Sequence, residues 1–284
     1  MKRTVKIIIA IIIILLCALT LASCGAKSKG SEGLNYVLTE DRQAYEVNGI
    51  GICTDTEIVI PSEFNDLPVV SINETAFYKC ETIKSVTISE GVTVIEARAF
   101  DGCEALESVT MPDSLTTIEF SAFHECPSLK NVVLSNGLTS IGDSAFFHCT
   151  SIESFVIPDT VTSVGKGVFS GCSSLKSVVI PAGIETITER MFSGCIALES
   201  VTIADGIIRI GENAFAYCSN LKELTIPSSL RWIYSGAFSN CYDPMTITYN
   251  GTKSDWNSVT GRYQWNYNPT GKYIIHCVDG DIEK

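Results

Sequence analysis

A phenylalanine and a cysteine, three residues apart, recur through most of this sequence at one fixed spacing. The frame begins as FYKC at 77–80 and returns as FDGC, FHEC, FFHC, FSGC, FSGC, FAYC and FSNC, each copy 23 residues after the last. The phenylalanines are Phe77, Phe100, Phe123, Phe146, Phe169, Phe192, Phe215 and Phe238. The cysteines are Cys80, Cys103, Cys126, Cys149, Cys172, Cys195, Cys218 and Cys241. A fixed period of this length predicts a solenoid, here of eight 23-residue coils.

The apolar positions inside each repeat predict how one coil is built. With the phenylalanine as position 1, apolar residues at positions 10 and 12 alternate with polar neighbours, which is the spacing of a strand. Proline follows at position 13 in four repeats and stops the strand, because it cannot donate to a ladder. Positions 16 and 19 predict a second short extended segment, and positions 23 to 7 a tight turn.

The repeated cysteine predicts a packed column, with no chemistry of its own. Free cysteine is among the most buried residue types and packs as a small apolar side chain. No two of these cysteines have the short C-x-x-C spacing of a metal site. Neighbouring coils, about 4.8 Å apart, are within disulfide reach, but stacked Cβ atoms point the same way and a bridge would distort the stack. We therefore interpret both columns as structural.

The repeat pattern L-x-x-V-x-I-P-x-x-L-x-x-I-x-x-x-A-F-x-x-C resembles that of BspA-type leucine-rich repeat proteins, a bacterial surface family. The resemblance covers about residues 34–278, because LNYVLTEDRQAYEVNGIG resembles the family's leading segment, and ITYNGTKSDWNSV and YIIHCVDG its terminal segments. It implies a leucine-rich-repeat solenoid of short parallel strands and turns, and adhesion to host proteins, matrix or other bacteria. The usual asparagine ladder is missing, so the horseshoe curvature of other leucine-rich repeats is not expected.

Both ends of the repeat array are atypical, as a capped solenoid requires. We assign residues 34–76 to an N-terminal cap with a degenerate first repeat, 77–241 to the repeats, and 242–284 to a C-terminal cap and tail. After Cys241 the frame fails: Pro244 stands where a leucine is expected, and Trp256 where an isoleucine is expected.

The first 33 residues predict export and attachment to a membrane. Residues 1–23 combine a basic start with a long apolar stretch, as in a secretion signal. The sequence LASC at 21–24 resembles the lipobox of bacterial lipoproteins, which implies cleavage and lipidation at Cys24. The alternative is an uncleaved membrane helix. Both alternatives place the body outside the cytoplasm. Residues 24–33, rich in Gly, Ser and Lys, are predicted to be a flexible tether.

Two rows of side chains are candidates for contact with a partner. Positions 9 and 11 point outward if positions 10 and 12 point inward, which gives a hydroxyl-rich face with Val133, Val156 and Val179 in its middle coils. These valines form either a contact site or an ordinary β-branched strand surface. Position 2, on the turn, carries larger side chains in the N-terminal half. Of these, Tyr78, His124 and Phe147 are the candidate anchors if that position is exposed.

Position 8 alternates in charge from coil to coil without interruption. The series is Lys84, Glu107, Lys130, Glu153, Lys176, Glu199 and Lys222. Descent from a duplicated pair of coils and selection for stacking register both account for this alternation.

Composition and motifs together favour recognition over catalysis. The net charge of −12 argues against nucleic acid as a partner. We find no catalytic constellation, no cofactor motif and no metal spacing in the sequence. We predict a lipid-anchored extracellular adhesion protein that binds a protein or glycan on a host, matrix or bacterial surface. The alternatives are a structural scaffold of the cell envelope without a dedicated ligand, and a lipoprotein that captures substrate.

Overall fold

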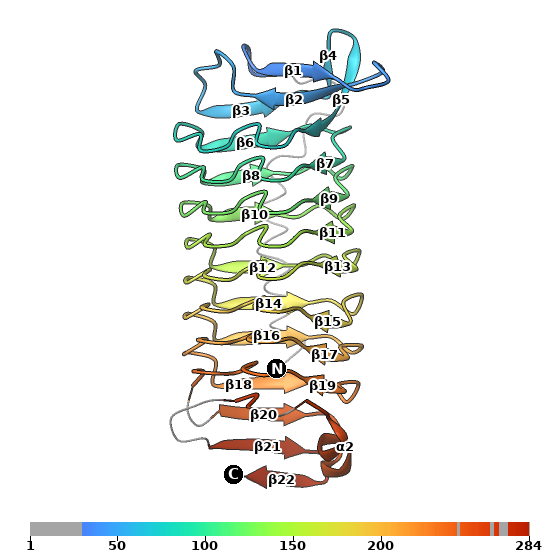
Figure 1. Cartoon of the computed structure of the whole chain (residues 1–284), viewed down its shortest axis with the longest axis vertical. Helices are drawn as coiled ribbons and strands as arrows, with labels where there is room; N and C mark the ends of the chain where they lie inside the picture. Colours follow the sequence, from blue (N-terminus) through green and yellow to red (C-terminus); the bar gives the residue numbers. More distant parts are fainter. Residues whose placement is uncertain (1–29, 243–244, 262–263, 267–271, 284) are drawn as a thin grey trace, which may run out of the picture.

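The computed structural model describes residues 30–242, 245–261, 264–266 and 272–283. The predicted signal peptide, Cys24 and most of the predicted tether lie outside the described residues. The chain forms a straight stack of coils, about nine turns of roughly 23 residues each (Figure 1). The predicted leucine-rich-repeat solenoid is confirmed, with one turn more than the eight predicted. The reason is that the segment before Phe77 already supplies strands to both faces of the stack.

The first strand of each coil builds what we call the long-strand face. Most successive strands pair in parallel, and within the repeats each paired residue faces the one 23 positions later, as Val86 faces Val109. The strands end at the proline of position 13 where one is present. They are β3 (Glu57–Ile60), β6 (Ser85–Ile88), β8 (Ser108–Thr110), β10 (Asn131–Val133), β12 (Ser154–Val156), β14 (Ser177–Ile180), β16 (Ser200–Ile203), β18 (Glu223–Ile226) and β20 (Met245–Tyr249).

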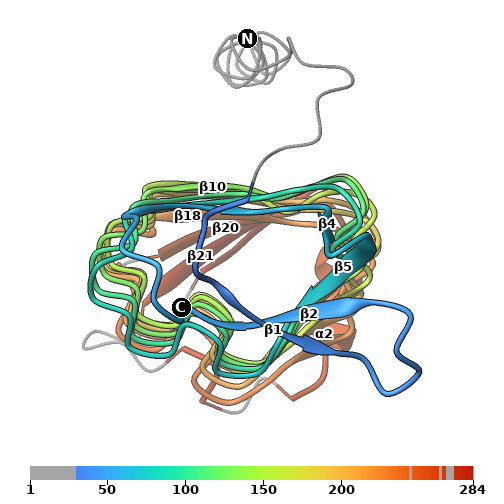
Figure 2. The ribbon, with the colours of Figure 1, turned by 90° about the horizontal axis from the view of Figure 1, so that it is seen from above.

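The second strand of each coil builds the short-strand face, mostly from two-residue strands at positions 18 and 19. Seen down the axis, the coils superimpose into one closed outline with the two faces on adjacent sides (Figure 2). The strands are β2 (Tyr45–Gly49), β5 (Leu67–Ile72), β7 (Val94–Ile95), β9 (Thr117–Ile118), β11 (Ser140–Ile141), β13 (Ser163–Val164), β15 (Thr186–Ile187), β17 (Arg209–Ile210) and β19 (Trp232–Ile233).

The core is a continuous apolar column along the axis. All eight phenylalanines of position 1 are almost fully buried. Their rings lie parallel, with centroids 5.0 Å apart between Phe77 and Phe100 and 5.3 Å apart between Phe215 and Phe238. Parallel rings at this separation are offset, which is a favourable arrangement for aromatic pairs. Each coil buries its apolar residues against its neighbours, so the interfaces between coils stabilise the fold.

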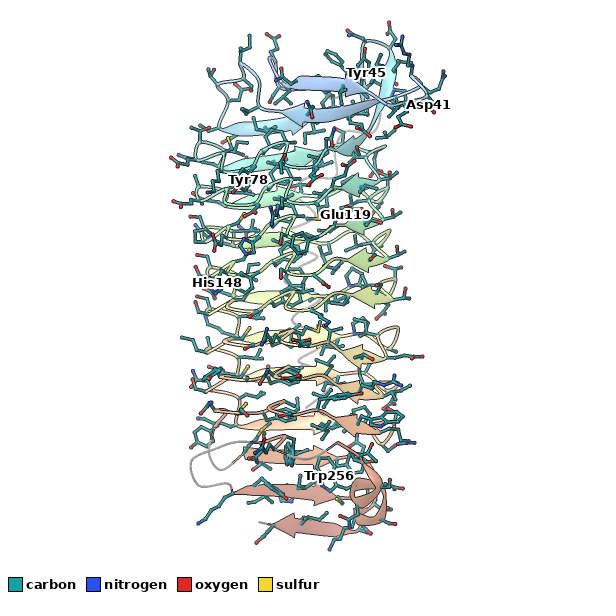
Figure 3. The ribbon with its side chains drawn as sticks, in the orientation of Figure 1. Asp41, Tyr45, Tyr78, Glu119, His148 and Trp256 are labelled. Atoms are coloured by element: carbon teal, nitrogen blue, oxygen red, sulfur yellow. The ribbon has the colours of Figure 1, made fainter. Side chains whose placement is uncertain are left out.

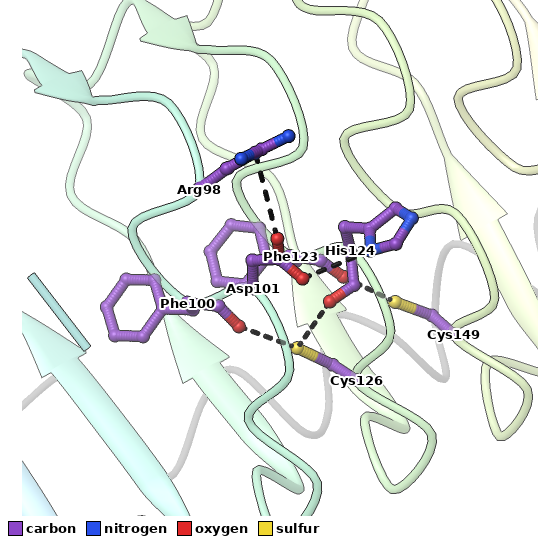
Figure 4. Close-up of polar contacts among 7 residues, drawn as sticks. All are labelled: Arg98, Phe100, Asp101, Phe123, His124, Cys126 and Cys149. Carbon is purple, nitrogen blue, oxygen red and sulfur yellow. Dashed lines mark hydrogen bonds and ion pairs between the residues drawn. The ribbon is translucent and has the colours of Figure 1, made fainter. Parts of the chain in front are cut away.

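The cysteine column carries hydrogen bonds that its apolar character did not predict. From Cys103 onward, each thiol donates to the carbonyl oxygen of the phenylalanine in the preceding coil, at 3.0–3.1 Å. Figure 4 shows two of these bonds, from Cys126 to Phe100 and from Cys149 to Phe123. Burial raises the pKa of the Cys172 thiol well above its ordinary value and raises that of Cys241 to about 12. The thiols therefore stay protonated and act as donors.

One larger side chain in the core disturbs the stack. Phe155 occupies position 10, where the other repeats carry valine or leucine. Its ring inserts edge-on, 5.1 Å from the ring of Phe146 and 4.5 Å from that of Phe169. These two rings are 5.8 Å apart, the widest spacing in the phenylalanine column. Strand pairing is interrupted on either side of this coil, between β10 and β12 on one face and between β13 and β15 on the other, and a further interruption lies between β16 and β18.

The ends depart from the repeat while continuing its pairing. At the start, β1 (Asn35–Leu38) pairs antiparallel with β2, and β4 (Glu63–Phe64) with β5. Ser31, near the end of the predicted tether, donates its N–H to Val59 O of β3 at 2.9 Å. At the other end, β20 pairs with β18 in the repeat register, so the frame extends one strand beyond Cys241. The helix α2 (Lys253–Ser258) and the strands β21 (Tyr273–Cys277) and β22 (Gly280–Glu283) then close the stack.

Candidate binding surface

Three aromatic rings stack on the turn edge of the middle coils. The ring centroids of His124 and Phe147 are 4.9 Å apart, with planes 5° from parallel. Those of Phe147 and His148 are 4.1 Å apart, with planes 10° from parallel. We call His124, Phe147 and His148 the ring stack. It brings together two of the three position-2 residues predicted from the sequence.

Backbone geometry places His148 on this stack. His148 occupies position 3 and has a φ of 56°, in the left-handed region, and Tyr217 at the same position has a φ of 63°. A left-handed corner turns the side chain back toward its neighbour in the chain. Gly171 leaves the space that the ring needs, because a Cβ atom there would overlap the His148 ring. Sequence reasoning missed His148, although position 3 is glycine in three of the eight repeats and asparagine in another, which signals a left-handed corner.

A carboxylate fixes one end of the ring stack. Asp101 Oδ1 lies 3.0 Å from His124 Nδ1, and Asp101 Oδ2 lies 3.9 Å from Arg98 Nε (Figure 4). Asp101 is largely buried, so the contact with His124 is shielded from water. The imidazole is thereby held in one orientation, with Phe147 over its face. Such an arrangement offers a rigid planar surface for a partner.

Tyr78 lies on the same edge but apart from the ring stack (Figure 3). Its side chain is 46% exposed, and Lys79 Nζ lies 5.2 Å from its ring centroid. Position 2 is not exposed in every coil, because Ala216 is buried at this position. The structure therefore places an exposed tyrosine and a partly exposed ring stack on one edge.

The three valines of position 11 face outward on the long-strand face. Their exposed fractions are 54% for Val133, 46% for Val156 and 39% for Val179. Val156 and Val179 lie opposite each other across β12 and β14, whereas Val133 lies on β10, beyond the interruption. We call these residues the valine stripe. Thr110 and Thr202 occupy the same position in the flanking coils, so the apolar surface has defined ends.

The alternating charges of position 8 form ion pairs in part of the array. Lys130 Nζ lies 3.0 Å from Glu107 Oε2, and Lys176 Nζ lies 2.7 Å from Glu153 Oε2. The hydrogen bonds from these lysines lower the pKa of Glu107 and of Glu153. All four side chains are about half exposed or more, so solvent weakens these pairs.

Within the described part of the chain, no group of three or more His, Cys, Asp or Glu residues could hold a metal ion. No helix in that part is both long and apolar enough to span a membrane. All ten cysteines described there are free thiols.

Comparison with known proteins gives a family match and similar solved structures. A family model described as "BspA type Leucine rich repeat region" matches residues 53–172 and 139–259, in six copies. A leucine-rich repeat protein of T. pallidum (TpLRR) is 31% identical, with a TM-score of 0.64, over 69% of this chain and 91% of its own. A leucine-rich repeat protein of Bacteroides ovatus is 29% identical, with a TM-score of 0.69, over 78% of this chain and 61% of its own. No curated protein matches.

Proposed function

Because this chain belongs to the BspA-type leucine-rich repeat family, we propose that it is a recognition protein of the bacterial surface without catalytic activity or cofactor. BspA-type proteins are typically bacterial surface proteins. The N-terminal sequence supports attachment through a lipid at Cys24, with the solenoid held outside the cytoplasm. Replacement of Cys24 by alanine should abolish incorporation of labelled palmitate and release the protein from the membrane fraction.

We propose that the partner is a protein on a host, matrix or bacterial surface. The observation that carries this proposal is the valine stripe, because Val156 and Val179 lie opposite each other on paired strands and, with Val133 of the coil before, expose apolar surface on the long-strand face. Contiguous exposed apolar surface is typical of protein contact sites. The ring stack and Tyr78 add rigid aromatic groups on a second edge, and aromatic anchors dominate the energetics of many interfaces. A glycan partner would gain less binding free energy from contact with the valine side chains.

The test is a binding screen with the purified full-length chain in detergent, against arrayed matrix proteins, glycans and bacterial cells. Replacing Val133, Val156 and Val179 together by threonine keeps the shape of each side chain and adds a hydroxyl. We expect saturable binding to a protein, weakened at least tenfold by the triple change, because each buried valine contributes about 1 kcal/mol or more.

The reverse change supplies the matched control. Replacing Thr110 and Thr202 by valine lengthens the stripe and should maintain or strengthen binding. Binding that neither set of variants affects would place the partner elsewhere and refute the valine stripe as the contact. Absence of binding, together with self-association of the pure protein, would support the scaffold alternative.

A further inference from the structure

The short-strand face is interrupted between β13 and β15, and we call this junction, residues 162–165 facing 183–188, the seam. In the coil before it, the N–H groups of Thr162 and Ser163 both donate to Thr139 O, at 3.1 and 3.2 Å. The equivalent bonds from Glu185 and Thr186 to Thr162 O are absent from this described stretch. The seam therefore exposes peptide N–H and C=O groups that lack strand partners.

The width of the seam is fixed on both sides. Thr188 Oγ1 donates across it to Gly165 O at 2.6 Å, whereas in the coil before, the peptide N–H of Gly165 donates to Ile141 O at 2.8 Å. On the long-strand face the same two coils stay paired, through β12 and β14. Inside the stack, the Phe155 ring lies against the rings of Phe146 and Phe169. The seam therefore cannot open far enough to admit a peptide strand, which needs about 4.8 Å on each side.

A shallow hollow of about 420 Å³, open to solvent, lies over the seam. Its polar lining consists of Thr162, Ser163, Glu185, Thr186 and Thr188. Each hydroxyl can donate and accept a hydrogen bond, and the carboxylate of Glu185 accepts. Together with the unpaired peptide groups, the hollow offers closely spaced donors and acceptors around a small volume.

A planar surface lies next to the hollow on the same face. Thr186 of β15 is in register with Arg209 of β17, and Arg209 with Trp232 of β19. The Arg209 guanidinium lies over the Trp232 ring, 4.7 Å from its centroid. Two strand spacings, roughly 10 Å, separate Thr186 from Trp232. A ligand long enough to extend from the hollow along the axis of the solenoid would contact Arg209 and Trp232.

We propose that the seam binds a neutral oligosaccharide, with one sugar ring in the hollow and the next against Arg209 and Trp232. Ring hydroxyls both donate and accept, which matches the mixed lining of the hollow. The Glu185 carboxylate and the net charge of −12 disfavour an acidic glycan. This site shares no residue with the valine stripe or the ring stack, so it adds to the proposed function without depending on it.

The test is saturation-transfer NMR on the full-length protein with cellobiose, lactose and chitobiose as probes. We expect transfer to at least one of them. Thr186→Val should weaken its binding about fivefold, because one hydrogen bond is lost. Trp232→Ala should weaken it as well. Thr117→Val changes the same position of a regular coil and should have no effect. Absence of transfer to all three sugars, or equal effects of the two threonine variants, would overturn the proposal.

A second measurement tests the origin of the seam. Phe155→Val restores the residue type common at position 10, so β13 and β15 should approach and pair. We expect slower hydrogen exchange at the Thr186 amide and loss of sugar binding, whereas Leu224→Val at the same position should change neither. A Thr186 amide already protected in the unaltered protein would show that the seam is closed and would overturn the proposal.

Discussion

At the scale of the residue, the cysteine at position 4 has two structural roles that no other small side chain combines. It fills a narrow apolar space, and its thiol donates to a peptide oxygen across the coil boundary. Phe146 O, for example, accepts from the N–H of Cys149 at 3.3 Å and from the thiol of Cys172 at 3.1 Å. Alanine lacks the donor, and serine brings a more strongly hydrated group into the core. The repeat therefore retains cysteine.

Replacing Cys172 by alanine should lower the free energy of unfolding by about 1–3 kcal/mol, through the lost packing and the lost hydrogen bond. Urea unfolding followed by circular dichroism measures the change. Cys80 is the matched control, because it occupies the same position in the first coil and its thiol contacts the Thr82 hydroxyl at 3.5 Å. Cys80→Ala should cost less than half as much. Equal losses at the two positions would argue against the thiol bond.

Spacing alone was enough to place the phenylalanine and cysteine columns, because a period of 23 stacks equivalent residues. It was not enough to predict where each thiol points, since that depends on the offset between coils. His148 was missed for a related reason. Its ring reaches Phe147 only because position 3 takes a left-handed conformation, which the glycines of other repeats signal but histidine itself does not.

At the scale of the element, alternation of polar and apolar residues predicted the long strands, and the prolines predicted their ends. The interruptions beside β12 were not predictable in the same way. Phe155 is apolar and satisfies the pattern, and only its size distinguishes it from the valines and the leucine at position 10 of other repeats. The C-terminal cap was recognised from the loss of the frame at Pro244. Even so, β20 keeps the repeat register, because strand pairing with β18 does not require the leucine that is missing.

The cap should behave as a separate unit of stability. Trp256 of α2 is buried, with its ring centroid 5.2 Å from Tyr249 and 6.1 Å from Trp265. Trp256→Ala should cost the cap about 3–5 kcal/mol. Hydrogen exchange should then accelerate in β20 and β21 while β8 and β14 remain protected, because each coil contacts only its neighbours.

Trp232→Ala provides the control for the cap, since Trp232 is only partly buried and packs beside Arg209 on the surface. Its effect on exchange in β21 should be small. Accelerated exchange along the whole array in the Trp256 variant would mean that the molecule unfolds as one cooperative unit.

At the scale of the whole molecule, the thiol column couples stability to alkaline pH. Burial is the first cause that raises the pKa of Cys172, Cys195 and Cys218 far above the ordinary 9.0, and that of Cys241 to about 12. An unfolded chain loses these protons above pH 9, whereas the folded chain keeps them. The stabilisation is therefore complete below pH 9 and declines as the pH rises toward the folded pKa values.

We expect the free energy of unfolding to fall above pH 9 by about 1.4 kcal/mol per pH unit for each of Cys172, Cys195, Cys218 and Cys241. Urea unfolding at pH 8, 9 and 10 under a reductant measures this slope. Cys241→Ala should reduce this slope by the contribution of one buried cysteine. A free energy of unfolding that stays constant from pH 8 to pH 10 would contradict protonated, buried thiols.

Because every regular coil meets its neighbours in the same register, the 23-residue coil is also a unit of length. Recombination between repeats in the gene could add or remove one coil, and the aromatic and thiol columns would remain continuous across the new junction. Each such event would change the length of the solenoid by about 4.8 Å. The coil that contains Phe155 is the exception, because its duplication would also copy the seam. The length of the solenoid and the number of its seams could thus evolve by separate events.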